Sequence, residues 1–480
     1  MRVTKRRKVV VVGGGITGLS AAFYIQKAVQ EQQLPIDITI IESSLRVGGK
    51  IQTYRKDGLI VERGPESFFD ISRSVRTLAR DLNIEHLLKE NKDGRSYMAV
   101  GSELHPIPSN ILFGGSPEVS SFIASSAVSL SGKIRAAGDL VLPRQKQEVD
   151  ESIGDFFRRR FGREVVENFI EPLLASTFAG DVDHQSLQSM FPQFYQLEKK
   201  YRSLLLGMKL TGSGFYSYEN GEEQLKYETF ENGLETLVET IEHQLSSVKI
   251  LKGVKVDCIE RMDNHALKVS TNSTEPLLAD YVLVTTPFNV AKSIFRHSSA
   301  MEHVEKMDSA TIGTVSMLFK EGQLEKYKDA MNFFVSRNSD FAITSCTWSN
   351  RKWDAVCPEG YELLRIYIGR VGDESIVELS DGEIERTIIQ DLQRIIGLKD
   401  APEKTIVTRW KGAMPQYTVG HEKRLEKISD EFYEQFPNVL LAGSSYEGIS
   451  IPSCVAQGRT AANDLLANLI DELRTTSVII

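Results

Sequence analysis

The chain has 480 residues, 41% hydrophobic and 25% charged, so it is ordinary globular material long enough for two or three domains. Its formal net charge of −8 at pH 7 argues against nucleic acid as the main partner. No uninterrupted apolar segment approaches the roughly 20 residues of a membrane-spanning helix, and the best candidate, residues 111–130, is broken by Pro117 and Glu118.

The first predicted element is a strand that runs directly into a glycine-rich turn. Residues 9–12 are four consecutive valines, as expected of a parallel strand buried on both faces. Gly13, Gly15 and Gly18 then form a G-x-G-x-x-G motif, and residues 19–33 are compatible with a helix. In such a unit the glycines permit a tight turn, close approach of a pyrophosphate, and close packing of helix on strand. The helix N-terminus then faces the phosphates.

A second apolar strand, residues 36–41, ends in Glu42. An acidic side chain at this place can accept hydrogen bonds from an adenosine ribose. The glycine motif alone would be weak evidence. Here the strand, motif, helix, second strand and terminal acid form one unit, which predicts dinucleotide binding rather than a glycine-rich turn without a ligand.

The segment after Glu42 favours FAD over NAD. It contains Arg46, Gly48 and Gly49 in an R-x-G-G pattern, and residues 62–67 read Glu-Arg-Gly-Pro-Glu-Ser. Adjacent glycines let the chain run close to a cofactor, and Arg46 is predicted to place a cation beside its phosphates. The arrangement resembles FAD proteins of the glutathione-reductase-2 type, which include amine oxidases, phytoene desaturases and protoporphyrinogen oxidases. An NAD dehydrogenase has no need for the second glycine segment.

The middle of the chain is predicted to be mainly helical. A short hairpin is expected over residues 97–108, followed by helices over residues 117–142 and 151–171. In the last of these, apolar residues recur at three- and four-residue steps. Arg158–Arg160 form a basic run on that helix, interpreted as a solvated face in preference to a membrane-facing patch.

Strands return towards the C-terminus. Buried strands are expected over residues 281–287 and 439–443, and alternating strands over residues 311–371 predict a sheet with one solvent-facing side. The last strand is followed by a polar loop, residues 444–457, and a helix, residues 458–470. In FAD proteins of this class, the N-terminus of such a helix meets the flavin.

The predicted fold class is α/β: a Rossmann-like FAD-binding fold with an inserted mixed-sheet substrate domain and an α-helical domain. Scaffold segments at the start, middle and end of the chain make the other two domains insertions. The predicted FAD-binding domain comprises residues 1–61, 217–290 and 430–480; the substrate-binding domain, residues 62–100, 178–216 and 291–429; and the α-helical domain, which would cap the substrate or face a membrane, residues 101–177.

The four cysteines, Cys258, Cys346, Cys357 and Cys454, show no C-x-x-C pairing and no nearby histidine ligands. This pattern predicts free thiols in a reducing compartment, hence a cytoplasmic protein, and no metal site. Cys454 lies in the segment expected to face the flavin. A buried spectator thiol is favoured there over covalent attachment to the flavin.

Taken together, these segments resemble the protoporphyrinogen oxidase family nearly from end to end. The likeness is greatest to its soluble form from Gram-positive bacteria, which acts as a coproporphyrinogen III oxidase. The first glycine motif is shared by many flavoproteins, whereas the middle and C-terminal segments are far more specific. The segments that carry the resemblance are residues 13–18, 46–53, 62–65, 171–174, 336–341, 414–417 with 420–421, and 442–448.

The resemblance implies a set of FAD contacts and a smaller set of substrate contacts. The substrate would lie between the helical insertion and the sheet, with Phe333 stacked on a pyrrole ring and Thr177 near the flavin. Family members place basic residues near positions 72 and 96 to meet propionates; this chain has serines there, so the neighbours Arg73 and Arg95 become the candidates. The implied FAD contacts are Gly13, Gly14, Gly15, Ile16, Thr17, Gly18, Glu42, Ser43, Lys50, Gly64, Pro65, Glu66, Ser67, Val256, Trp410, Ile449, Ser450 and Ile451.

The implied activity is the oxidation of coproporphyrinogen III to coproporphyrin III in haem biosynthesis. In each of three two-electron steps a hydride passes from a meso carbon to flavin N5 and a pyrrole N–H loses its proton, while O₂ reoxidises the flavin and gives H₂O₂. The protein positions the meso carbon and excludes water, so no side chain is assigned as a catalytic group. Expected partners are the porphyrinogen, O₂ and the next enzyme of the haem pathway, with at most peripheral membrane contact.

Protoporphyrinogen IX oxidation is the alternative main activity. A water-soluble substrate with four propionates suits this chain better, because the helical insertion offers no long apolar face for docking on a membrane. A flavin amine oxidase would place an aromatic residue in the last flavin-facing loop, and none occurs between Glu447 and Gln457. A carotenoid desaturase would need a longer apolar surface, and a non-enzymatic carrier of the same fold need not keep a complete flavin site.

Overall fold

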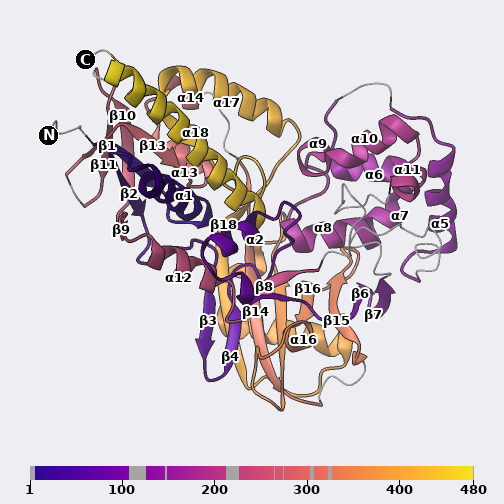
Figure 1. Ribbon diagram of the computed structural model, residues 1–480. Helices are drawn as coiled ribbons and strands as arrows, with labels where there is room; N and C mark the ends of the chain where they lie inside the picture. The colour runs from indigo at the N-terminus through magenta and orange to yellow at the C-terminus, as the bar shows by residue number, and fades with distance from the viewer. Residues whose placement is uncertain are drawn as a thin grey trace.

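A computed structural model has three parts: a parallel sheet between two layers, a larger mixed sheet, and a helical unit to one side (Figure 1). The structure describes residues 6–107, 126–145, 149–211, 226–263, 265–273, 275–302, 307–322 and 327–478. The predicted helix over residues 117–142 therefore lies in part outside the described residues.

The N-terminal strand is central in a five-stranded sheet of order β19-β13-β1-β2-β9, in which every neighbouring pair is parallel. Val9 and Val11 pack into one core and Val10 and Val12 into another, on the opposite face. This confirms the predicted strand buried on both faces. The strands are β1 (Arg7–Val12), β2 (Ile36–Glu42), β9 (Lys249–Lys252), β13 (Tyr281–Val284) and β19 (Val439–Leu441).

Helices cover one face of this sheet, and a small antiparallel sheet with further helices covers the other. The first and last helices of the chain pack so closely that a Cβ on Gly458 would lie 2.4 Å from Thr17 O. The first face carries α1 (Ile16–Gln32), α2 (Ser74–Asp81), α12 (Glu235–Gln244) and α18 (Ile451–Val478); the second carries β10 (Val256–Arg261), β11 (Leu267–Thr271), β12 (Leu277–Ala279), α13 (Phe288–Ile294), α14 (Ser299–Glu302) and α17 (His421–Gln435).

The larger sheet has seven strands in the order β18-β14-β17-β16-β15-β6-β7, antiparallel except between β15 and β6. Helix α16 (Asp381–Ile396) packs on one face, and its apolar side chains form a separate core with those of the strands. The strands are β6 (Arg95–Val100), β7 (Glu103–Ile107), β14 (Ser309–Lys320), β15 (Ala330–Val335), β16 (Ile343–Trp348), β17 (Tyr361–Ile368) and β18 (Lys404–Pro415).

The opposite face of this sheet was predicted to be solvent-facing, and that prediction is wrong. Thr314, Ser316 and Thr347 are polar but buried. The segment that follows β4 (Leu59–Glu62) packs over them: Thr314 Oγ1 donates to Arg63 O at 2.8 Å. The alternation of polar and apolar residues therefore marks a sheet face that is covered by another segment of the chain and not by solvent.

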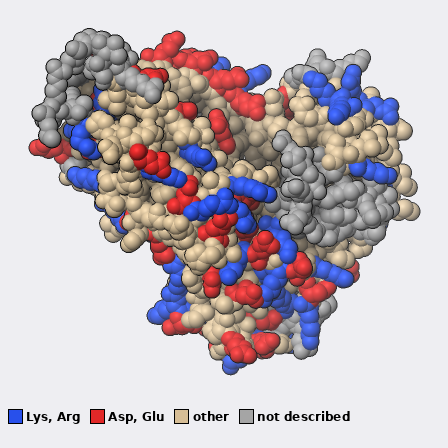
Figure 2. Space-filling model, viewed as in Figure 1, with Lys and Arg blue, Asp and Glu red and all other residues tan. Residues whose placement is uncertain are grey.

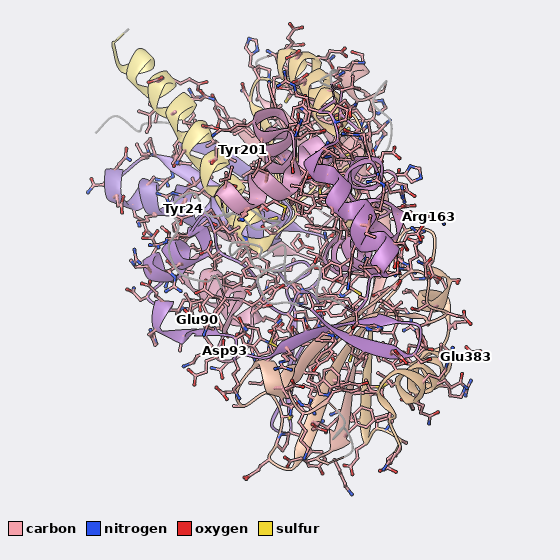
Figure 3. The ribbon with its side chains drawn as sticks, turned by 90° about the vertical axis from the view of Figure 1, so that its right-hand side faces the viewer. Tyr24, Glu90, Asp93, Arg163, Tyr201 and Glu383 are labelled. Carbon is pink, nitrogen blue, oxygen red and sulfur yellow. The ribbon has the colours of Figure 1, made fainter. Side chains whose placement is uncertain are left out.

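The helical unit has a single apolar core centred on Phe156, Phe157 and Phe194. Gly162, at φ +88°, ends α6, so the predicted helix over residues 151–171 is divided. Figure 3 shows Arg163 and Tyr201 on this unit and Glu383 on α16. The unit comprises α5 (Leu130–Ala137), η2 (Gly138–Leu140), α6 (Ile153–Phe161), α7 (Arg163–Val165), the π-helical turn η3 (Val166–Ile170), α8 (Glu171–Phe178), α9 (Leu187–Met190), α10 (Pro192–Tyr201) and α11 (Leu204–Thr211).

The helical unit thus extends past the predicted end at residue 177, and residues 103–107 belong to the large sheet instead. Short elements join the three parts. They are the hairpin β3 (Thr53–Lys56) and β4 (Leu59–Glu62), η1 (Glu85–Leu87), the pair β5 (Leu88–Glu90) and β8 (Glu228–Phe230), α15 (Ser349–Lys352) and η5 (Ser375–Glu378).

Candidate flavin and substrate site

The glycine-rich turn between β1 and α1 is shaped to admit a ligand. Gly13 has φ +109°, a value that strains other residues, and its N–H donates to Ile41 O at 2.9 Å. A Cβ on Gly18 would lie 2.1 Å from Gly13 O, whereas a Cβ on Gly15 would meet no atom within 4 Å. Among the described residues no side chain caps the N-terminus of α1. The first-turn N–H groups are therefore left for a pyrophosphate.

Glu42 links this loop to the end of β2. Its Oε2 accepts a hydrogen bond from Gly14 N–H at 2.7 Å, and its Oε1 accepts one from Ser44 N–H at 2.8 Å. The Ser43 and Ser44 hydroxyls also donate to Oε1, at 3.3 and 2.7 Å. Each carboxylate oxygen has two acceptor positions. Glu42 Oε2 thus keeps one position for a ribose hydroxyl while it fixes the loop.

The second glycine segment packs backbone to backbone on the first. Gly48 N–H donates to Gly14 O at 2.7 Å, and a Cβ on Gly49 would lie 3.3 Å from Gly15 Cα. Arg46 behaves differently from the prediction: its guanidinium pairs with Glu235 of α12 at 2.7 Å and donates to Gly49 O at 2.9 Å. This ion pair ties the second glycine segment to α12.

The segment Gly64–Ser67 is held from the large sheet. Buried Arg365 donates to the carbonyls of Glu62 and Gly64, and Trp410 Nε1 donates to Arg63 O at 2.7 Å. A Cβ on Gly64 would lie 1.7 Å from Lys50 O, so this segment also touches the second glycine segment. Pro65 lies between Gly64 and Glu66, within the same held stretch. The predicted contacts Gly64, Trp410 and Lys50 are therefore brought together.

The carboxyl groups of Glu62 and Glu66, on either side of Gly64, are buried and bind other groups of the protein. Glu66 accepts hydrogen bonds from Lys352 Nζ at 2.8 Å and Ser349 Oγ at 3.1 Å, which leaves mainly its backbone for a cofactor. Burial opposes the ionisation of Glu66, but Lys352 and Arg365 lower the pKa of its carboxyl. Glu62 has no such cation contact through its carboxylate, and burial raises its pKa to about 8.

A cavity of about 240 Å³ adjoins the same segment between β4, β8 and α15. Glu62, Glu66 and Arg365 form its polar wall, and Phe230 and Trp353 contribute aromatic surface. The cavity contains neither the glycine loop nor any predicted substrate residue.

Lys50 and Cys454 face each other beside the phosphate loop. Burial lowers the pKa of the Lys50 ammonium, and burial raises the pKa of the Cys454 thiol. The sulfur lies 3.8 Å from Gly448 O and 4.0 Å from Ile449 O, so it packs under the last loop. All four cysteines are free thiols.

The loop between β19 and α18 returns the C-terminus to the glycine-rich turn. Gly443 N–H donates to Gln457 Oε1 at 2.9 Å, and Gln457 Nε2 donates to Gly448 O at 3.2 Å. Gly448 has φ +114°. Ile449, Ser450 and Ile451 follow it and are partly or fully exposed at the start of α18. A flavin stretched from the phosphate loop towards α18 would meet these three residues.

Two further predicted cofactor residues lie at opposite ends of the site. Val256 is buried at the start of β10, close behind Val254, whose N–H donates to Glu42 O at 3.0 Å. Its side chain belongs to the core, so only its backbone can meet an adenosine. Thr17, in the first turn of α1, is buried against α18.

The structure places the predicted substrate residues unevenly. Phe333 is fully buried in the core under α16, with its ring 5.7 Å from that of Trp348, so it offers no face to a ligand. Side chains alternate along a strand, and the neighbouring Phe334 points to the opposite side, where it packs with Phe169 and Leu173 of the helical unit. Thr177 is exposed at the end of α8.

The two candidate arginines differ in their surroundings. Arg95 pairs with Asp329 at 3.3 Å on the surface, where its side chain is 70% exposed. Arg73 is exposed at the N-terminus of α2, at φ +53°. The next residue, Ser74, donates from Oγ to Pro452 O at 2.7 Å, which brings Arg73 beside the start of α18. Of the two arginines, Arg73 is the one that lies beside the start of α18.

Sequence reasoning missed three side chains that shape the site. Arg365 is a charged residue in an apolar strand, and that mismatch is a signal that could have marked it. Tyr417 and His421 lie in segments quoted for the family resemblance, but no role was assigned to them. Both contact the loop between β19 and α18.

The sequence profile described as flavin containing amine oxidoreductase matches residues 16–466. The chain belongs to this family. It is 46% identical to the coproporphyrinogen III oxidase of Bacillus subtilis over 97% of this chain and 99% of that protein. It is 36% identical to the coproporphyrinogen III oxidase of Staphylococcus aureus, over 96% and 100%. A solved structure of a protein from Exiguobacterium sp. 255-15 matches with TM-score 0.83 and 30% identity, over 96% of this chain and 98% of that chain.

Membership confirms the predicted family resemblance and the α/β fold with its mixed sheet and helical region. The protein is an oxidoreductase, and its cofactor is FAD. The residues fit that group: the glycine-rich turn has open space where a Cβ would otherwise stand, α1 has an uncapped end, and Glu42 Oε2 keeps an acceptor position.

Proposed function

We propose that the protein oxidises coproporphyrinogen III to coproporphyrin III in haem biosynthesis, with O₂ as the electron acceptor and H₂O₂ as the second product. The observation that carries this proposal is the 46% identity, over nearly the whole of both chains, to a protein named coproporphyrinogen III oxidase. The preserved flavin site supports an enzyme rather than a carrier.

When it is bound, FAD supplies the two-electron acceptor. The chain positions the cofactor and the substrate and keeps water out of the site. The glycine-rich turn and Glu42 hold the adenosine and pyrophosphate half. Residues 64–67 and 448–451 border the flavin half from two sides. Cys454 is not poised as a base, since burial disfavours its thiolate. The work of the side chains is to orient the macrocycle and exclude water.

The macrocycle is proposed to lie between the helical unit and the large sheet, with Phe334 rather than Phe333 against a pyrrole ring. Phe334 is the aromatic residue of β15 on the face that meets the helical unit. Arg73 is proposed to meet a propionate, because a guanidinium matches a carboxylate and Arg73 has no ion pair among the described residues. Arg95 is the weaker candidate because its guanidinium already forms an ion pair with Asp329.

The location is proposed to be cytoplasmic, with weak contact to anionic membranes through the helical unit. The described residues contain no helix that is both long and apolar enough to cross a bilayer. Leu130, Ile134, Val141 and Leu210 are each more than 60% exposed on this unit. Figure 2 shows Lys and Arg side chains around tan surface on the same unit. Apolar side chains with basic neighbours suit the surface of an anionic bilayer.

The function is tested by a side-by-side fluorescence assay of porphyrin formation from coproporphyrinogen III and protoporphyrinogen IX in low detergent. The proposal expects the higher kcat/KM for coproporphyrinogen III. Arg73→Ala should narrow the difference, whereas Arg95→Ala, the matched arginine with an ion pair, should change it less. A clear preference for protoporphyrinogen IX, or a requirement for lipid, would make the alternative substrate the main one.

A further inference from the structure

One tyrosine hydroxyl closes the loop between β19 and α18. Tyr417 follows β18 and is buried. Its hydroxyl donates to Ser444 O at 2.9 Å and accepts from Gly448 N–H at 2.8 Å. These two bonds draw together the beginning and end of residues 444–448. Gln457 Nε2 and the Cys454 thiol also contact this stretch at Gly448, through its carbonyl, at 3.2 and 3.8 Å.

His421 holds the middle of the same loop. It is the first residue of α17 and is buried, with its ring stacked on that of Tyr417 at 4.0 Å between centroids and 11° between planes. Its Nε2 lies 3.0 Å from Tyr446 O. A carbonyl only accepts, so Nε2 carries the hydrogen and the neutral ring leaves Nδ1 without one. Nδ1 has no hydrogen-bond partner among the described residues, as this tautomer permits.

The position of the loop decides what the flavin meets. Gly448, at φ +114°, leads directly into Ile449–Ile451, and a Cβ there would lie 2.7 Å from Ser453 Cβ. The chain therefore has little freedom at the point where it turns into α18. The stacked pair Tyr417 and His421 fixes three backbone groups of the loop, which are the carbonyls of Ser444 and Tyr446 and the amide of Gly448. These bonds can hold the turn into α18 in a single position.

We propose that Tyr417 and His421 act together as positioning residues that fix the loop 444–451 against the flavin ring. This inference rests on the proposed flavin site. The effect of the pair passes through the backbone of Ser444, Tyr446 and Gly448. The stack makes the two side chains one unit, since movement of either ring displaces the other.

Tyr446 provides a matched control. It lies in the same loop and is buried, but its hydroxyl has no hydrogen-bond partner among the described residues. Tyr417→Phe removes two hydrogen bonds and keeps the stacked ring, whereas Tyr446→Phe removes a hydroxyl that makes none. His421→Phe keeps a ring for stacking and removes the donor to Tyr446 O. The double variant Tyr417→Phe/His421→Phe shows whether the two act as one unit.

The first measurement is amide hydrogen exchange of residues 444–448 in the FAD-free protein. Exchange should be faster in Tyr417→Phe and His421→Phe, and should match wild type in Tyr446→Phe. The second measurement is the visible circular dichroism of bound flavin together with kcat and KM. Tyr417→Phe should change the flavin signal and lower kcat by about tenfold to a hundredfold, the scale of a small misplacement, with KM nearly unchanged. The double variant should lose little more than either single variant.

Equal behaviour of Tyr417→Phe and Tyr446→Phe in exchange and in the flavin signal would overturn the proposal. Faster exchange with an unchanged flavin signal and kcat would overturn it too, because the loop would then be fixed without positioning the ring. Failure of the wild-type protein to oxidise any porphyrinogen would refute the proposed function instead. The exchange and dichroism measurements would still decide the role of the pair.

Discussion

Replacing Glu42 by alanine should weaken FAD binding without unfolding the protein. The change removes the bond from Gly14 N–H at 2.7 Å and the second acceptor position on Oε2, which we expect to face the adenosine ribose. A hydrogen bond to a charged group contributes about 1.5–3 kcal/mol. Loss of the ribose contact alone would therefore raise the Kd for FAD by about 10- to 150-fold. Loss of the tether to Gly14 places Glu42→Ala at the upper end of that range.

The assay is titration of FAD-free protein with FAD, followed by quenching of flavin fluorescence. ADP, which carries the same ribose, should compete less well in the variant by a similar factor. Ser44→Ala is the control, because it removes a hydroxyl that donates to Oε1 at 2.7 Å and leaves Oε2 untouched. A Kd for Glu42→Ala close to that of wild type would show that the carboxylate does not hold the ribose.

Three further changes test other parts of the site. Gly448→Val should lower kcat more than it lowers the melting temperature, because a valine at φ +114° and in contact with Ser453 would strain the loop and not a core. Normal turnover in this variant would show that the loop does not lie against the flavin. Phe334→Ala should raise KM for the porphyrinogen. Phe333→Ala should mainly destabilise the protein, by about 3–5 kcal/mol, as expected of a large core deletion. The reverse pattern in KM and melting temperature would return the stacking role to Phe333. Glu62 has a folded pKa raised to about 8, so the stability associated with its protonated form is present below about pH 4.5 and is lost as pH rises through 8. Glu62→Gln should therefore gain melting temperature relative to wild type from pH 5 to pH 8.5, and parallel curves would contradict this.

The βαβ unit could be predicted from the sequence because every local signal in it agrees. Val9–Val12 are apolar on both faces, the glycines follow at the required spacing, and Glu42 ends the next strand. Such a unit can be predicted because the local preferences of its residues agree with their places in the tertiary structure. The C-terminal strand, loop and helix were predicted for the same reason.

Other parts could not be predicted because their meaning depends on distant segments. A shift of one residue turns a strand side chain to the other face, so the sequence could not decide between Phe333 and Phe334. Thr314 and Ser316 alternate with apolar residues, as in a strand with one solvent-facing side, but the segment after β4 covers them. The ion pair between Arg46 and Glu235 could not be predicted, because Glu235 lies far along the chain. Arg365 is likewise explained only by carbonyls about 300 positions away.

The order in which the ribosome makes the chain gives the split parallel sheet a further consequence. Strands β1 and β2 emerge first, but β19, which completes the edge beside β13, and α18, which packs on α1, come about 400 residues later. At the usual 5–20 residues per second, that interval lasts roughly 20–80 s. During this time the nascent nucleotide-binding half has an unpaired strand edge and an uncovered apolar helix face. Chaperone protection should matter most in this interval, and a nonsense mutation even near the end of the gene should yield a chain that cannot retain FAD.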